Sequence, residues 1–437
     1  MRRSGKSDRY VEYQTQLLAA MRAQLPCRGL PLLSPDQRVR WSDRLLVIAA
    51  LLMAWTPATR LQEAFAGVRE TLVAMYSTRR RPGADLSGFL KALRKRSAVL
   101  LTRVTQTLRE RTRQQAGESW RWKRWVVLGV DGSRINCPRT GANEQAFGCA
   151  GKSRTAPQQL LLTLFHVATG LPWAWRRERG DASERGLLRD LLGELPEQML
   201  LLADAGFTGY DLLRMLDNAG HAFVVRAGRN VSLLRKLGYS VRERRGTVYL
   251  WPGKQRRQTP LVLRLVQLQA GRRRMALLTN VLDEATLSDA EMAELYRRRW
   301  TIEVMFRSLK QTLGKRTLRA ETPALAQCEL DWALAGLWML GLMTLAETGV
   351  RLGWSPAGAL SVVRLAMENR RRRVGARRLR LLLRTARPDS YTRHGPKATR
   401  DWPHKKRERP PGTPKIRMAT QPEITAAKQL RNKLHAA

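Results

Sequence analysis

Two aspartates follow short apolar runs, at positions where an active site could form. Asp131 comes directly after Trp125–Val130, and Asp204 ends the run that begins at Gln198. Both runs are typical of strands inside a sheet, and the ligands of α/β sheets gather at the carboxyl ends of such strands. Small residues follow each aspartate, which would let a substrate approach the backbone closely. The competing interpretation is that each aspartate only caps a turn.

A predicted helix supplies a third carboxylate beside cationic and aromatic groups. The residues concerned are Tyr296, Arg299, Glu303 and Lys310, spaced three, four and seven apart. At about 100° per residue they lie within roughly 60° of one another around the helix axis. A plain solvated helix face with an Arg299–Glu303 ion pair would show the same spacing. The neighbouring Trp300 makes the stripe less typical of such a face.

Three carboxylates without a local counter-charge repel one another, and a divalent cation relieves that repulsion. Mg²⁺ or Mn²⁺ prefers the hard oxygen ligands that Asp131, Asp204 and Glu303 would provide. Two such ions about 3.5–4 Å apart can activate an attacking oxygen and stabilise the leaving oxygen in phosphoryl transfer. Arg299 and Lys310 would then hold flanking phosphates. The set predicts metal-dependent chemistry on a phosphodiester.

The charge balance predicts a nucleic-acid partner. The 437 residues include 80 Lys and Arg but only 36 Asp and Glu, which gives a formal net charge of +44. Self-repulsion at that charge opposes compaction. A polyanion relieves it, because each neutralised phosphate releases condensed counterions. Tyr296 would hydrogen-bond a phosphate or stack on a base of this partner. An acidic membrane surface is the weaker alternative, because no strongly amphipathic terminal helix is present.

The pattern along the chain predicts a mixed α/β core. Apolar spacing of three and four residues predicts helices within residues 1–120. From Trp125 to Ala227 the predicted order is β-β-β-α-β-α-β, with Asp131-Gly132 ending the first strand and a helix over Ser183–Leu195. Residues 228–282 show a β-rich pattern with three strands.

The predicted helix that carries Glu303 runs unbroken from its N-cap at Ser288 or Asp289 to about Gly314. An apolar helix is expected over 324–347, where burial in the core is favoured over a partner groove. The tail from Asn369 is rich in Arg and Pro and is expected to be basic and partly disordered.

Other kinds of chemistry are not indicated. The longest apolar runs fall short of the roughly 18–20 residues of a membrane span, and the basic start lacks the apolar run of a secretory signal. The four cysteines are far apart in no CxxC pattern, which favours a reducing cytoplasm. The segment Ala146–Ser153 resembles a phosphate-binding loop but lacks the strand before it and the helix after it. His166, inside a predicted strand, is expected to be packed in the core.

Three segments carry a family resemblance. They are VDGSRI around Asp131, LLADAGF around Asp204, and YRRRWTIEVMFRSLK from Tyr296 to Lys310. The last contains the pattern Y-x2-R-x3-E-x6-K with every spacing intact, and FVVRAG follows the second Asp. Over roughly residues 120–345 the sequence therefore resembles the bacterial DDE transposases of the insertion-sequence-four superfamily.

The resemblance implies a ribonuclease-H-like catalytic core. We expect it over residues 121–345, with the β-rich insertion at about 228–282. A helical DNA-binding domain is expected over residues 1–120, and a C-terminal helical and basic tail over 346–437. Asp131, Asp204 and Glu303 would form the metal-binding triad of this fold.

The same resemblance implies a function. We expect a bacterial, nucleoid-associated cytoplasmic transposase that binds inverted-repeat ends as a synaptic homodimer, cleaves DNA with Mg²⁺ or Mn²⁺ and joins the ends to target DNA. Some relatives cut through a hairpin and hold a flipped base with an aromatic residue, for which Trp251 and Trp300 are candidates. Two alternatives stay open: a metal-dependent nuclease that does not join DNA, and a non-enzymatic DNA-binding protein derived from a transposase.

Overall fold

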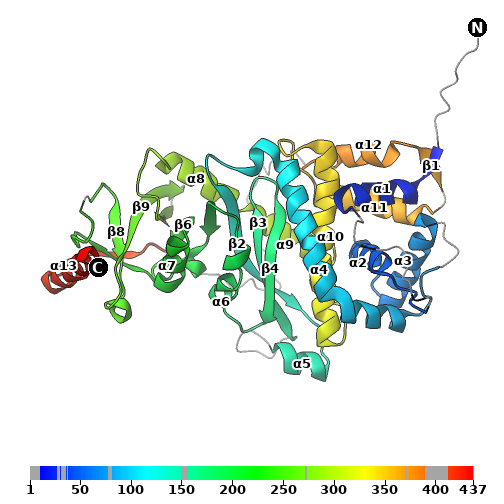
Figure 1. The fold of residues 1–437 in the computed structure, drawn as a ribbon, viewed down its shortest axis with the longest axis horizontal. Coiled ribbons are helices and arrows are strands. Elements are labelled where there is room, and N and C mark those ends of the chain that lie inside the picture. Colours follow the sequence, from blue (N-terminus) through cyan, green and yellow to red (C-terminus); the bar gives the residue numbers. More distant parts are fainter. Residues whose placement is uncertain are drawn as a thin grey trace, which may run out of the picture.

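The computed structural model describes residues 10–26, 30, 36, 38–76, 81–148, 156–241, 243–270, 273–370, 372–388 and 412–436. Within these residues a ten-stranded mixed sheet has helices on both faces, and a helical region extends from one end of it (Figure 1). The strands of this sheet are β2 Val126–Asn136, β3 Gln158–His166, β4 Leu171–Arg179, β5 Met199–Ala203, β6 Ala222–Ala227, β7 Ser232–Arg235, β8 Thr247–Leu250, β9 Leu261–Ala270, β10 Arg273–Thr279 and β12 Lys415–Met418. A separate pair is formed by β1 Tyr10–Glu12 and β11 Arg373–Gly375.

The helices flank this sheet or form the helical region. They are α1 Tyr13–Gln24, α2 Asp43–Trp55, α3 Leu61–Met75, α4 Leu86–Ala116, α5 Gly141–Phe147, α6 Glu184–Arg189, α7 Tyr210–Asn218, α8 Asp289–Arg298, α9 Thr301–Arg307, α10 Pro323–Thr348, α11 Pro356–Glu368, α12 Arg378–Thr385 and α13 Gln421–Ala436. The predicted order β-β-β-α-β-α-β is confirmed as β2-β3-β4-α6-β5-α7-β6, with α5 as an additional short helix between β2 and β3.

The spatial order of the strands places the parallel strands β6, β5 and β2 next to one another inside the sheet. It runs β12-β7-β8-β9-β10-β6-β5-β2-β3-β4. Strand β5 pairs in parallel with both β2 and β6, whereas β3 and β4 add antiparallel strands on one side. The predicted β-rich stretch is confirmed as β8 to β10, and it also contains β7. It prolongs the same sheet, because β10 pairs antiparallel with β6.

Three sequence predictions about element boundaries were wrong. Strand β2 does not end at Asp131 but continues to Asn136, because its antiparallel partner β3 extends beyond the point where β5 stops. The helix predicted over Ser183–Leu195 is the short α6 followed by a 3-10 turn, consistent with the poor helix propensity of its glycines. The tail from Asn369, for which a helical, basic and partly disordered segment was predicted, contains β11, α12, β12 and α13; its residues 371, 389–411 and 437 lie outside the described residues.

The third wrong prediction concerns the helix that carries the charged stripe. Ser288 caps α8 as predicted, and Glu291 completes its capping box. The helix is interrupted at Arg299 and Trp300, resumes as α9, and passes into a π-helical turn over Ser308–Thr312. The seven-residue spacing from Glu303 to Lys310 crosses this turn, so the angle calculated for a regular α-helix does not apply there.

Alternating side chains divide the interior into two cores. On β2, Val127 and Ile135 face the core that contains α8, α9 and α10, while Val126, Leu128 and Val130 face the core that contains α6 and α7. This is the two-residue period of a strand buried on both faces. We call the two sides the α10 face and the α6 face.

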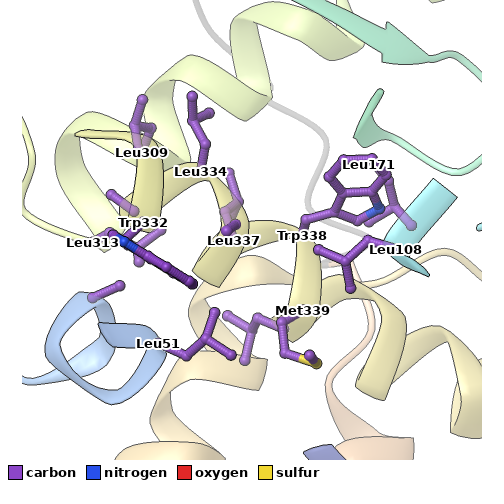
Figure 2. Packing of buried hydrophobic residues seen from close by; sticks show 14 of the residues in the cluster. Leu51, Leu108, Leu171, Leu309, Leu313, Trp332, Leu334, Leu337, Trp338 and Met339 are labelled. Atoms are coloured by element: carbon purple, nitrogen blue, oxygen red, sulfur yellow. The ribbon is translucent and has the colours of Figure 1, made fainter. Parts of the chain in front are cut away.

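Helix α10 is the centre of the larger core. Trp332, Leu334, Leu337, Trp338 and Met339 project from it toward Leu51 of α2, Leu108 of α4 and Leu171 of β4 (Figure 2). It is long and apolar enough to cross a membrane by composition, but 94% of its apolar window is buried inside the fold. The prediction that this stretch is a core helix is confirmed.

Helices from both ends of the sequence share that core. Helices α1 to α4 and α10 to α12 contribute residues from Tyr13 to Ala386 to it, and they lie together in Figure 1. The domain boundaries at residues 120 and 345 stay predictions. His166 is buried as predicted, with Nε2 3.1 Å from the Trp120 carbonyl oxygen. Cys137 and Cys328 are buried, whereas the predicted loop residues 149–155 lie outside the described part.

A buried ion cluster joins the segment after the π-helical turn to α10. Glu329 accepts hydrogen bonds from Lys315 Nζ at 2.7 Å and from Arg319 Nε at 2.9 Å. Its second oxygen accepts the backbone N–H groups of Arg319 and Ala320. The side chains of Glu329 and Lys315 are only 10% and 5% exposed. The cluster therefore fixes the C-terminal end of the segment that carries Glu303 and Lys310.

Candidate active site

The register of two parallel strands places Asp131 and Asp204 side by side. Strand β2 pairs with β5 from Val126↔Met199 to Gly129↔Leu202. Continued by two residues, this register sets Asp131 opposite Asp204, across the roughly 4.8 Å that separates neighbouring strands. Asp204 keeps an extended backbone, with φ −80° and ψ −177°, and its Oδ1 accepts the Gly206 N–H at 2.8 Å.

Both aspartates point to the α10 face. Side chains two residues apart on a strand share one face. Asp131 therefore lies on the same face as Val127 and Ile135, and Asp204 on the same face as Leu200 and Leu202, and these four apolar residues belong to that core. Tyr296 of α8 and Ile302 of α9 lie in the same core. The two carboxylates therefore face the segment that carries the predicted stripe.

The carboxyl group of Asp131 is shifted in pKa by several neighbouring charged groups. Burial and the neighbouring Asp204 and Glu184 together raise the pKa of its carboxyl to about 7, against the opposing effects of Arg299 and the Gly132 N–H. Repulsion between carboxylates disfavours the ionised form, as does loss of water. The site thus concentrates negative charge in a partly buried place.

Arg299 connects the aspartates to the stripe. Its Nη2 lies 3.7 Å from Oε1 of Glu303, and its guanidinium carbon is 5.5 Å from the centre of the Tyr296 ring. Burial raises the pKa of Tyr296, which also feels the charges of Arg226 and Asp204. Arg299 is only 14% exposed and Glu303 is 39% exposed. Arg299 therefore connects Glu303 and Tyr296 with Asp131, and Tyr296 lies within electrostatic reach of Asp204.

Lys310 reaches the site from the π-helical turn. Burial and the nearby Arg316 lower the pKa of its ammonium, and Asp131 opposes that shift. The structure therefore places Lys310 within electrostatic reach of the first aspartate. A π-helical turn alters which residues share a helix face, and such turns are frequent at functional sites.

A comparison with protein families matches the region that contains all of these residues. The family model described as "Transposase DDE domain" matches residues 122–339. The chain is also 28% identical over 223 residues to transposase InsG for insertion sequence element IS4 from Escherichia coli strain K12. This chain belongs to the DDE transposases of the insertion-sequence-four type. The family predicted from the sequence is confirmed.

The sequence similarity to the InsG protein covers only part of each chain. The aligned part is 48% of this chain and 50% of the InsG protein, so the transposase chain matches about half the length of that relative. Among solved structures, it is similar to the piggyBac transposase synaptic complex with hairpin DNA, determined by cryo-electron microscopy. That similarity has a TM-score of 0.39 at 11% identity and covers 89% of this chain and 84% of the other.

The two aromatic candidates of the transposase differ in accessibility. Trp251 is 2% exposed, and its indole N–H donates to the carbonyl oxygens of Gln255 and Gln258. Arg256 covers its ring, with the guanidinium carbon 4.2 Å from the ring centre. Trp300, at the break between α8 and α9, is 62% exposed. Only Trp300 of the two presents an open ring surface beside the candidate site.

Two charged residues near the transposase site were missed by the sequence analysis. Arg226 of β6 lies close enough to influence Tyr296, and its position in FVVRAG after the second Asp was the available signal. Glu184 begins α6 and raises the pKa of Asp131 from the other face of the sheet. No motif marked Glu184, because the fold alone brings it there.

The donor set suits a divalent cation. The charges of Asp204 and Glu184 raise the pKa of the partly buried Asp131, and such a set of carboxylates favours a hard cation that takes oxygen ligands. In the part of the chain that the structure describes, no three Asp, Glu, His or Cys side chains form a ready metal cage. Mg²⁺ typically uses one or two protein carboxylates together with substrate phosphates and water. The residues therefore fit an ion that is bound together with substrate.

Proposed function

We propose that this chain is a DNA transposase that cuts the ends of an insertion sequence and joins them to target DNA. The observation that carries the proposal is the register that sets Asp131 opposite Asp204, facing the helix of Glu303 within a transposase DDE domain. The mixed sheet β2-β3-β4-α6-β5-α7-β6 supports a ribonuclease-H-like core. The substrate would be the terminal inverted repeats of the element.

Asp131, Asp204 and Glu303 would hold Mg²⁺ or Mn²⁺ in this mechanism. When bound, the cation supplies Lewis-acid activation of the attacking oxygen and stabilises the leaving oxygen. Asp131 and Asp204 would orient the scissile phosphate from the sheet, and Glu303 from α9. Arg299 lies 3.7 Å from Glu303, and its guanidinium would bind a phosphate oxygen of the DNA.

Cationic groups around the carboxylates would bind the DNA backbone. Lys310 lies within electrostatic reach of Asp131, and Tyr296 is held under the guanidinium of Arg299. The net charge of +44 extends this attraction over the whole chain. We further propose a synaptic homodimer as the active assembly, with residues 1–120 contributing to DNA binding.

Replacing Trp300 with Ala should weaken binding of the cleaved end. Base stacking on an exposed aromatic ring contributes about 1–3 kcal/mol, so we expect the dissociation constant to rise by about 5- to 150-fold. Fluorescence anisotropy with a pre-cut inverted-repeat end measures it. Tyr10→Ala is the matched control, because Tyr10 is exposed but belongs to β1 in the helical region. Equal binding by Trp300→Ala and wild type would contradict this role.

Replacing Glu303 with Gln tests the proposed function itself. The change keeps the shape of the side chain and removes the charge, so cleavage of an inverted-repeat end should be lost while end binding is largely kept. Glu294→Gln is the control, because Glu294 lies on α8 and pairs with the exposed Arg298 at 2.6 Å. Cleavage at wild-type rate by Glu303→Gln would overturn the assignment.

A strand-transfer assay with pre-cut ends separates the two alternative functions. Wild-type protein given pre-cut ends and a target plasmid should join them in Mg²⁺ or Mn²⁺. A nuclease without strand transfer would cleave uncut ends but leave pre-cut ends unjoined. A non-enzymatic DNA-binding protein would bind the ends and show neither reaction.

A further inference from the structure

Glu184 places a further carboxylate next to the aspartates. A Cβ built on Gly132 would lie 2.3 Å from Glu184 Oε1, 2.6 Å from its Cδ and 2.8 Å from its Cγ. The Glu184 side chain thus occupies the space where any larger residue at position 132 would project. Only glycine admits the carboxylate there.

The Glu184 side chain approaches Gly132 from the side of the sheet opposite to Glu303. Gly132 alternates along β2 with Leu128 and Val130, so a side chain at position 132 would point to the α6 face. Leu187 and Leu188 of α6 are buried in that core, and the helix packs against β3 and β4, on the side of β2 away from β5. The Glu184 carboxylate consequently lies beside the backbone that follows Asp131, and within electrostatic reach of Asp204.

No structural role within the fold accounts for this carboxylate. Among the described residues, the carboxylate of Glu184 forms no hydrogen bond and no ion pair within 4.0 Å. Arg134 is the cation that lowers its pKa, but the Nε of Arg134 donates to the Gly180 carbonyl oxygen at 2.8 Å. A charged side chain placed so close to two other carboxylates, without a partner of its own, makes the fold less favourable unless a cation is bound.

We propose that Glu184 is a positioning residue that strengthens divalent-metal binding at Asp131 and Asp204 from the α6 face. This inference rests on the proposed metal-dependent function. Its carboxylate adds negative charge from the side of the sheet opposite to α9, which would favour a bound cation. Glu184 would thereby set how much Mg²⁺ or Mn²⁺ the site requires.

The test measures binding of Mn²⁺ alone to the full-length protein by calorimetry. Glu184→Gln should raise the dissociation constant by about tenfold, and Glu184→Asp should give a smaller rise because its carboxylate withdraws from Gly132. Asp190→Asn is the matched control, because Asp190 is an exposed acid at the end of the same helix. A melting temperature in EDTA equal to that of the wild type shows that the fold is intact, and Glu184→Asp serves if Glu184→Gln does not fold.

A second pair of variants tests the geometry. Gly132→Ala should weaken Mn²⁺ binding by displacing the Glu184 carboxylate, and it should add little in a Glu184→Ala background, where the space is empty. Equal Mn²⁺ affinity of Glu184→Gln and wild type, with lost affinity in Asp131→Asn, would overturn the role of Glu184 alone. Unchanged affinity in both variants would overturn the proposed metal site as well.

Discussion

Replacing Asp131 with Asn should reduce DNA-end cleavage by about 10³-fold or more. Asp131 is the carboxylate on which the other charges of the site converge: Asp204 and Glu184 raise its pKa, and Arg299 lowers it. The change would remove one proposed cation ligand while keeping side-chain size and the parallel register of β2. Metal-ion catalysis contributes several kcal/mol of transition-state stabilisation, and about 4 kcal/mol corresponds to 10³-fold in rate.

Single-turnover cleavage of a labelled inverted-repeat end measures this loss, and an electrophoretic shift of the same DNA checks that binding persists. Asp211→Asn is the matched control, because Asp211 is an exposed acid in the first turn of α7, outside the proposed site. A variant at position 131 that retained a tenth of the wild-type rate would show that this carboxylate does not hold the reacting phosphate.

Replacing Glu329 with Gln should lower the free energy of unfolding by about 3–5 kcal/mol. The substitution leaves the ammonium of Lys315 buried without its carboxylate partner, and breaking a buried ion pair on one side costs that much. Denaturant unfolding measures the change. Glu321→Gln is the control and should change stability by less than about 0.5 kcal/mol, because Glu321 is an exposed acid just before α10.

The difference in stability between wild type and Glu329→Gln should also depend on pH, because of the same ion cluster. Burial would raise the pKa of Glu329, but Lys315 and Arg319 lower it from the ordinary 4.5 to about 2. A lowered carboxyl pKa stabilises the fold above the unfolded-state pKa, and the contribution is lost as the pH falls through the folded-state value. The stability difference between wild type and Glu329→Gln should therefore be constant above about pH 4.5 and shrink toward pH 2. A difference independent of pH in that range would contradict this interpretation.

Much of the sheet was predictable because its strands carry their own signal. The apolar runs around Leu128, Leu162 and Leu201 are buried on both faces, and such runs are recognisable without tertiary information. The capping box at Ser288 is equally local, since all of its partners lie within one turn. The charged stripe was found by spacing, and the family match covers the same residues.

The features that could not be predicted from the sequence depend on contacts between distant parts of the chain. The length of β2 is decided by β3, and the break at Trp300 and the π-helical turn interrupt a sequence with no Pro or Gly to mark them. Glu184 meets Gly132 only because α6 folds back over β2, across fifty residues of sequence. Tertiary packing overrides local preference at these points.

Strand β12 completes one margin of the sheet, where it pairs in parallel with β7. Ribosomal synthesis delivers β7 long before β12, so the backbone groups on that margin have no strand partner while the residues between Arg235 and Lys415 are being made. An unpaired strand margin invites pairing with other nascent chains. A transposase of this architecture would then pass through a vulnerable interval in the cell, which closes only when its basic tail has left the ribosome and folded back.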